Sequence, residues 1–180
     1  YTSYILNKGE LKVQVILPDL RWNRSPLESV GRLSYMFSKA PNNLGPYEAT
    51  QDKSSTMLGH AQWDWLEQQL REPADVRILA SSLQFLPEFT GWESWANMPH
   101  ERQRFLTLLD SYQINNLVIV SGDTHWGELS KYQQNLDYPL YEMTSSGLTE
   151  KWKDVSPNKH RVGDYTHEVN YGDLTIDWQK

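Results

Sequence analysis

The stretch "LVIVSGDTHWGEL", residues 117–129, decides the fold, because a run of branched apolar residues stops abruptly at Ser121-Gly122. A continuously apolar run of this length is typical of a strand in a parallel sheet, where both faces are covered. Asp123 and His125 follow two positions apart. Because sites in open α/β sheets form at the carboxyl ends of strands, the stretch predicts a buried strand over 116–121 that ends at a functional site.

The flanking sequence extends this strand into an α/β pattern. A helix with a regular apolar stripe is predicted directly before it, and a strand before that helix, which together form a βαβ unit. A turn at Asn7 and Gly9 predicts an N-terminal hairpin. Residues 18–56 lack periodicity and predict a long excursion with one short helix near 27–37. The predicted strands are 2–6, 11–17, 75–82, 116–121, 138–144 and 171–178, and the predicted helices are 57–72 and 99–113.

Composition narrows the class of protein. The 180 residues suffice for one domain with a core, and 17 basic against 23 acidic residues give a net charge of −6. That balance argues against a general nucleic-acid or anionic-membrane binder. No stretch approaches the roughly 18 apolar residues of a membrane span. Cysteine is absent, which excludes disulfides, thiolate nucleophiles and cysteine-based zinc sites. Eight Trp and ten Tyr are consistent with a ring-rich core or with a carbohydrate-stacking surface.

Asp123 and His125 are the candidate metal ligands. If the segment stays extended, their side chains point the same way, since strand side chains repeat every two residues. A carboxylate and a neutral imidazole form a partial ligand set for zinc, iron or manganese. The alternative is a turn in which Asp123 makes a local hydrogen bond and His125 is a half-buried polar residue. A similar pair, Asp164 and His167 in "GDYTHE", follows no apolar strand, and we interpret it as a solvated loop.

Five further stretches, in order, accompany this segment, and together they resemble the PhoD-like alkaline phosphatase/phosphodiesterase family of the calcineurin-like metallophosphoesterases. The family's Asp-x-Arg strand end, Leu-Gly-x-x-Gln-x-x-Trp-Leu helix, Glu-x-Trp loop, Ser-Gly-Asp-x-His segment, Ser-Ser-Gly-Leu-Thr segment and closing Asn-Tyr/Phe-Gly strand all have counterparts. They are "VILPDLRWNR" (15–24), "MLGHAQWDWLEQQL" (57–70), "ILASSLQFLPEFTGWESWANMPHERQRFL" (78–106), "VSGDTHWGEL" (120–129), "YPLYEMTSSGLT" (138–149) and "NYGDLTIDW" (170–178).

The resemblance implies a fold and a chemistry. The fold would be part of a metallophosphoesterase-type β-sandwich with a mixed sheet, flanked by helices. Asp123 and His125 would be catalytic and would ligate a dinuclear or multinuclear centre of iron or zinc with calcium or another divalent ion. The substrate would be a phosphate mono- or diester, and export or a periplasmic location is a property that the resemblance suggests.

The family's earlier metal ligands are not found in place in this sequence. They belong to an Asp-x-His/Cys element, a Gly-Asp element and an Asn/Asp-rich element. We therefore expect residues 1–180 to be one domain that forms the C-terminal portion of the catalytic domain, inactive by itself. A second departure is Pro18, where the family has an apolar residue before Asp-x-Arg.

Four more residues are candidates for substrate binding, each with an alternative. Arg21 follows a strand end and could clasp phosphate bidentately, or form an ion pair with Asp19 or another carboxylate. Gln84 could reach the same cleft, or bind backbone as a loop amide. Trp126 could wall the site or pack under the sheet, and Asn170 could touch the cleft or form a turn before the last strand.

One interpretation from a different class remains open. The chain could be a non-catalytic binding module that binds a sugar or a protein through aromatic loops, with Asp123 and His125 purely structural. A protein that keeps the fold and has lost the metals is a third.

Overall fold

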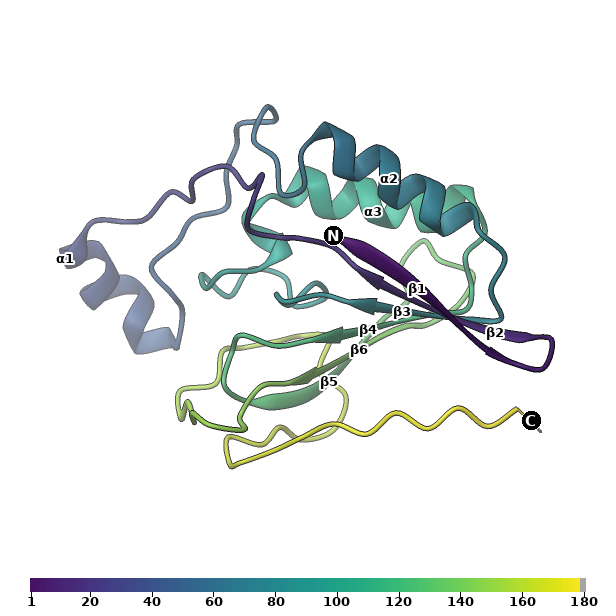
Figure 1. Cartoon of the computed structure of the whole chain (residues 1–180). Coiled ribbons are helices and arrows are strands. Elements are labelled where there is room, and N and C mark those ends of the chain that lie inside the picture. The colour runs from purple at the N-terminus through teal and green to yellow at the C-terminus, as the bar shows by residue number, and fades with distance from the viewer. Residues whose placement is uncertain (179–180) are drawn as a thin grey trace.

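The computed structural model describes residues 1–178 as one six-stranded mixed sheet in the order β1-β2-β3-β4-β6-β5 (Figure 1). The pairs β2–β3, β3–β4 and β4–β6 are parallel, whereas the outer pairs β1–β2 and β5–β6 are antiparallel. The strands are β1 Thr2–Lys8, β2 Leu11–Leu17, β3 Val76–Ala80, β4 Leu117–Ser121, β5 Gly127–Tyr132 and β6 Leu140–Ser145. The α/β class and the mixed sheet are confirmed.

Two long helices cover one face of this sheet. Helix α2, His60–Arg71, connects β2 to β3, and α3, Pro99–Ser111, connects β3 to β4 (Figure 1). Pro99 occupies the first turn of α3, as expected. The buried Glu101 carboxylate accepts hydrogen bonds from the Trp63 indole at 2.7 Å and from the Met57 backbone at 2.8 Å, and so ties the start of α2 to α3.

The core lies between these helices and the sheet. Alternate strand residues such as Ile16, Leu79 and Ile119 are fully buried there, against Trp63 of α2 and Phe105 of α3. The other members of the same strands are only half-buried. Within residues 1–178 both crossover helices lie on one side of the sheet and the other face is only partly covered.

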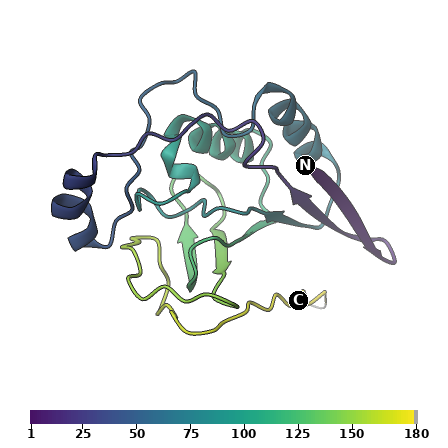
Figure 2. The same ribbon diagram turned by 60° about the vertical axis from the view of Figure 1, so that its left-hand side comes forward.

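The long excursion carries a short helical arm. It comprises α1 Arg32–Ser34, a π-helical turn η1 Tyr35–Lys39 and a 3-10 turn η2 Ala40–Asn42. The helix predicted near 27–37 thus exists but lies later in the chain. Figure 2 shows the arm extending away from the sheet. After the arm, residues 43–50 return toward the strand ends. A further 3-10 turn, η3 Trp95–Asn97, precedes α3.

Two strand predictions differ from the structure. The strand predicted over 171–178 does not form, and the segment instead crosses the open sheet face, where a Cβ on Gly172 would lie 3.0 Å from Met143 (Figure 1). Conversely, β5 was not predicted. Its outer edge is partly taken by isolated bridges from Arg161 and Thr166. No helix within residues 1–178 is long and apolar enough to cross a membrane.

Candidate functional site

The turn that follows β4 is strained at two residues. Asp123 has φ 73° and His125 has φ 63°, both in the left-handed region that non-glycine residues rarely adopt. The extended geometry considered for this segment is therefore wrong. Gly122 is not the residue that adopts the special conformation, and a Cβ there would meet its nearest neighbour at an ordinary 3.6 Å. Strain of this kind collects at functional sites, and here it falls on the two candidate ligands.

Asp123 presents one engaged and one free carboxylate oxygen. Its Oδ1 lies 3.2 Å from Arg21 Nη2. Within residues 1–178, Oδ2 accepts no hydrogen bond. Burial raises the pKa of the Asp123 carboxyl above its ordinary value, and the Arg21 guanidinium opposes that rise. A half-buried carboxylate with a free oxygen suits a cation as its next partner.

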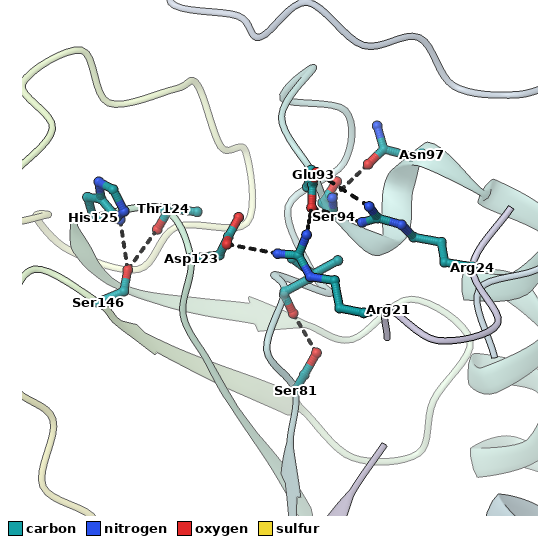
Figure 3. A network of polar contacts seen from close by, with 11 residues as sticks. Arg21, Arg24, Ser81, Glu93, Ser94, Asn97, Asp123, Thr124, His125 and Ser146 are labelled. Atoms are coloured by element: carbon teal, nitrogen blue, oxygen red, sulfur yellow. Dashed lines mark hydrogen bonds and ion pairs between the residues drawn. The ribbon is translucent and has the colours of Figure 1, made fainter. Parts of the chain in front are cut away.

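His125 is held by its backbone and leaves its ring free. Its N–H donates to Ser146 Oγ at 2.8 Å, and its carbonyl accepts from the Trp152 N–H at 3.2 Å. The imidazole makes no hydrogen bond to any residue in 1–178, so both ring nitrogens are available for a ligand. Figure 3 shows His125 on the far side of Asp123 from Arg21.

Arg21 bridges two carboxylates from different loops. Its Nη1 lies 2.5 Å from Glu93 Oε2, which Arg24 also approaches at 2.8 Å (Figure 3). Burial raises the pKa of Glu93, but Arg24 and Arg21 outweigh it, and the net shift is downward. The Asp19 carboxylate instead accepts the backbone N–H groups of Arg21 and Trp22. The ion pair weighed for Arg21 thus forms, with Glu93 and Asp123 rather than with Asp19.

These groups line one pocket of about 310 Å³. Of the six predicted site residues, it contains Arg21, Asp123, His125 and Trp126. The remaining lining residues come from four loops and are not among those six: Pro46, Tyr47, Trp92, Glu93, Thr124 and Trp152. The signal for Glu93 and Trp92 is their place in the long loop between strand and helix, because such loops line sites on this architecture. No local sequence pattern identifies Trp152 as a site residue.

Gln84 and Asn170 lie elsewhere. Gln84 is buried beneath the site, and its amide donates to Glu128 Oε1 at 2.7 Å and to Thr144 Oγ1 at 3.1 Å. The buried Trp126 indole donates to the same Glu128 oxygen at 3.1 Å, so Trp126 both lines the pocket and packs under the sheet end. Asn170 accepts from Ser145 and lines a groove on the open sheet face.

Residues 1–178 supply part of a metal site at most. They contain no group of three or more His, Cys, Asp or Glu side chains that could hold a metal ion. Asp123 and His125 fit the donor chemistry of such a site, as a hard oxygen and an imidazole nitrogen with free lone pairs. Asp164 is solvent-exposed and His167 is half-exposed, in keeping with the solvated loop expected there.

Comparison with known proteins also relates this chain to a part of larger proteins. Residues 6–173 match the PhoD-like phosphatase family. Alkaline phosphatase D of Bacillus subtilis (strain 168) is 28% identical over 115 residues, a match that covers 59% of this chain and 19% of that protein. A solved structure described as the structure of PhoD superposes with a TM-score of 0.65 at 18% identity, over 94% of this chain and 35% of its own.

The chain therefore spans about a fifth of the length of the curated relative and about a third of the solved structure. The structural likeness establishes a shared fold for this portion. The family match covers nearly all of the sequence. On that match, the chain belongs to the PhoD-like phosphatase family.

Proposed function

We propose that this chain carries the last part of the catalytic centre of a metal-dependent enzyme that hydrolyses phosphate mono- or diesters. One observation carries the proposal. Asp123 and His125, both in a left-handed conformation after the end of β4, line the same pocket with a free oxygen and a free ring, and the other Asp123 oxygen lies 3.2 Å from Arg21. Family membership supports a phosphate ester as the substrate.

Each residue has a distinct role in this proposal. Asp123 Oδ2 and the His125 ring hold metal, with iron or zinc and a second divalent ion such as calcium as the candidates. A bound metal polarises a phosphoryl oxygen and supplies hydroxide at neutral pH. Arg21 binds the phosphate oxygens, since a guanidinium fork matches them bidentately. His125 acts as a ligand and not as a free base, and its ring is available for that role while its backbone N–H and carbonyl are already paired.

The remaining ligands come from a part of the enzyme outside residues 1–180. This chain is then the C-terminal portion of the catalytic domain, and the half-buried apolar face formed by residues such as Ile78, Val120 and Met143 packs against a second sheet. The support is the partial span of both relatives and the two-ligand limit at the pocket. In this arrangement the fragment alone is inactive.

Metal content and hydrolysis of a nitrophenyl phosphodiester should be measured together on the natural full-length protein. The variants are Asp123→Ala/His125→Ala and, as a matched control, Asp164→Ala/His167→Ala, which removes the same two residue types from a loop outside the pocket. We expect the first pair to lose metal and activity together and the control to keep both. Full activity in the first pair would refute the assignment.

A second candidate is a binding module without catalysis. The two contacting indoles in the pocket, Trp92 and Trp152, favour it, because their ring centroids lie 5.5 Å apart beside polar groups. Absence of metal and turnover in the unmutated full-length protein would leave this function in place of the hydrolase.

A further inference from the structure

The pocket lining has two chemically different parts. Arg21, Glu93 and Asp123 form the charged part. We define the aromatic wall as four further lining residues, Pro46, Tyr47, Trp92 and Trp152. The indoles of Trp92 and Trp152 form a T-shaped pair, in which the two ring planes lie at 78° to each other. No role follows for these four residues from the ligation and phosphate binding assigned above.

The loops that carry the aromatic wall are held together by their own backbone hydrogen bonds, without a ligand. Tyr47 N–H donates to the Gly91 carbonyl and Gly45 N–H donates to the Thr90 carbonyl, both at 2.9 Å, which pairs the two loops. A Cβ on Gly45 would lie 2.3 Å from the Gly91 carbonyl oxygen and 2.6 Å from the Trp92 ring. The loops therefore fit together only because position 45 is glycine, and the Trp92 indole rests on that backbone.

The same wall is tied to the strained turn. The Trp152 N–H donates to the carbonyl of His125, so the backbone that presents the candidate imidazole also positions one indole. Trp152 is 38% exposed and Trp92 is half-buried, and both line the pocket. Exposed large apolar surface in a cleft indicates a binding role.

From this arrangement we infer that the aromatic wall binds a flat, uncharged aromatic substituent of the phosphate ester whose phosphate is bound by Arg21. The inference rests on the proposed function and narrows its substrate class to small aryl esters. Aromatic rings pair with indoles in edge or offset geometry, and the wall already offers both a face and an edge. A pocket of about 310 Å³ is at the small end of ligand sites, which fits one ring beside one phosphate.

A sugar fits this wall less well. Its hydroxyl groups would each need a hydrogen-bond partner, and the side chains of the wall contribute only the Tyr47 hydroxyl and the indole N–H donors of Trp92 and Trp152. Unpaired hydroxyls on burial are costly, whereas an aryl ring makes no such demand.

The test measures phosphonates, which cannot be hydrolysed. Binding of phenylphosphonate and methylphosphonate to the natural full-length protein is measured by calorimetry, together with hydrolysis of a nitrophenyl phosphodiester. The variants are Trp152→Ala and Trp92→Ala. Trp22→Ala is the matched control, because Trp22 is 86% exposed and lies outside the pocket.

We expect the unmutated protein to bind phenylphosphonate roughly tenfold more tightly than methylphosphonate. That preference should fall to within about twofold in Trp152→Ala and persist in Trp22→Ala. Trp152→Ala removes a partly exposed ring and should keep its fold, so the inference stays testable if Trp92→Ala does not fold.

Equal affinity for the two phosphonates, or an aryl preference that survives Trp152→Ala, overturns the inference. If hydrolysis nevertheless continues, the proposed hydrolase stands without an aromatic subsite. An aryl preference that depends on Trp152, found without hydrolysis, upholds the subsite and removes the catalytic proposal.

Discussion

The side chains of Arg21 and Asp123 meet at 3.2 Å although 102 positions separate them in the sequence. Arg21 follows β2 and Asp123 follows β4, and two parallel pairings with β3 bring these strand ends to the same edge of the sheet. Glu93, from the loop after β3, is the third member of this bridge. The sheet topology thus creates the charged side of the pocket from three consecutive strand ends.

Arg21→Lys should lower kcat/KM for phosphodiester hydrolysis by at least tenfold in the full-length protein. A lysine keeps the charge but cannot span a phosphate and a carboxylate with a planar fork. Because Arg21 is 52% exposed, the melting temperature should change little. Steady-state kinetics and thermal unfolding check the two parts.

The control is Arg24→Lys. Arg24 contacts Glu93 but not Asp123, and it does not line the pocket. Its substitution should cost less than a threefold loss in kcat/KM. Equal losses in the two variants would mean that both arginines act only by fixing Glu93, and Arg21 would lose its role as a phosphate ligand.

The position of this edge could be predicted from local patterns, because each strand is apolar and ends at a polar residue. Asp123 and His125 were identified in that way, and Arg21 was identified through its match to the family's Asp-x-Arg strand end. Gln84 obeys the same rule but its amide turns inward, because the buried Glu128 and Thr144 offer acceptors. A sequence pattern specifies where a strand ends, and it does not specify which side of the backbone a loop side chain takes.

Strand β5 was missed because its buried side is polar. Glu128 and Ser130 are buried there, and a pattern that requires apolar residues on the inner face rejects such a strand. The charge is tolerated only because Arg161, 33 residues further on, approaches Glu128. The strand wrongly predicted over 171–178 has the opposite explanation. Its alternation of apolar and polar residues is real, but the segment lies across a sheet face instead of pairing with a strand.

The strain at His125 predicts opposite effects of glycine at two positions. His125→Gly should be more stable than His125→Ala by about 1 kcal/mol, because only glycine adopts a φ of 63° without strain. At Gln68, an exposed position inside α2, alanine should be more stable than glycine by about 1 kcal/mol. Chemical denaturation of the four variants measures both differences.

Both substitutions at His125 remove the ring, so both should lose metal. If His125→Gly is more stable than the unmutated protein and loses metal, the strained turn is kept for its function. If His125→Ala proved as stable as His125→Gly, the left-handed conformation would carry no cost, and the argument from strain would fail.

The buried carboxyl of Glu142 should make stability depend on pH. Burial raises its pKa from 4.5 to about 6, although the backbone N–H groups of Leu86 and Phe85 donate to it. Between these two values the folded state binds more protons than the unfolded state, so the free energy of unfolding falls as pH rises from about 4.5 to about 6. The loss is about 2 kcal/mol.

Denaturant unfolding between pH 4 and about 7 tests this dependence. Glu142→Gln should flatten the slope in that window, whatever its effect on absolute stability. Glu10→Gln, at an exposed position in the turn between β1 and β2, is the control and should keep the slope. An unchanged slope in Glu142→Gln would assign the pH dependence to other groups.

The ion pair of Glu128 with Arg161 should be essential to the support beneath the turn. Arg161 Nε lies 2.6 Å from Glu128 Oε2, while Gln84 and the Trp126 indole donate to Oε1. Arg161→Met leaves a carboxylate that is 1% exposed without its counter-charge, and should lower the free energy of unfolding by roughly 3 kcal/mol.

Adding Glu128→Gln to Arg161→Met should recover part of that loss, because the neutral amide still accepts from Trp126 and no longer needs a cation. A double-mutant cycle by chemical denaturation measures the coupling between the two positions. The control pair is Lys151 with Glu168, at 2.7 Å and exposed on both sides, for which the coupling should stay below about 1 kcal/mol. Strictly additive losses at Glu128 and Arg161 would show that the turn rests on the hydrogen bonds to Oε1 alone.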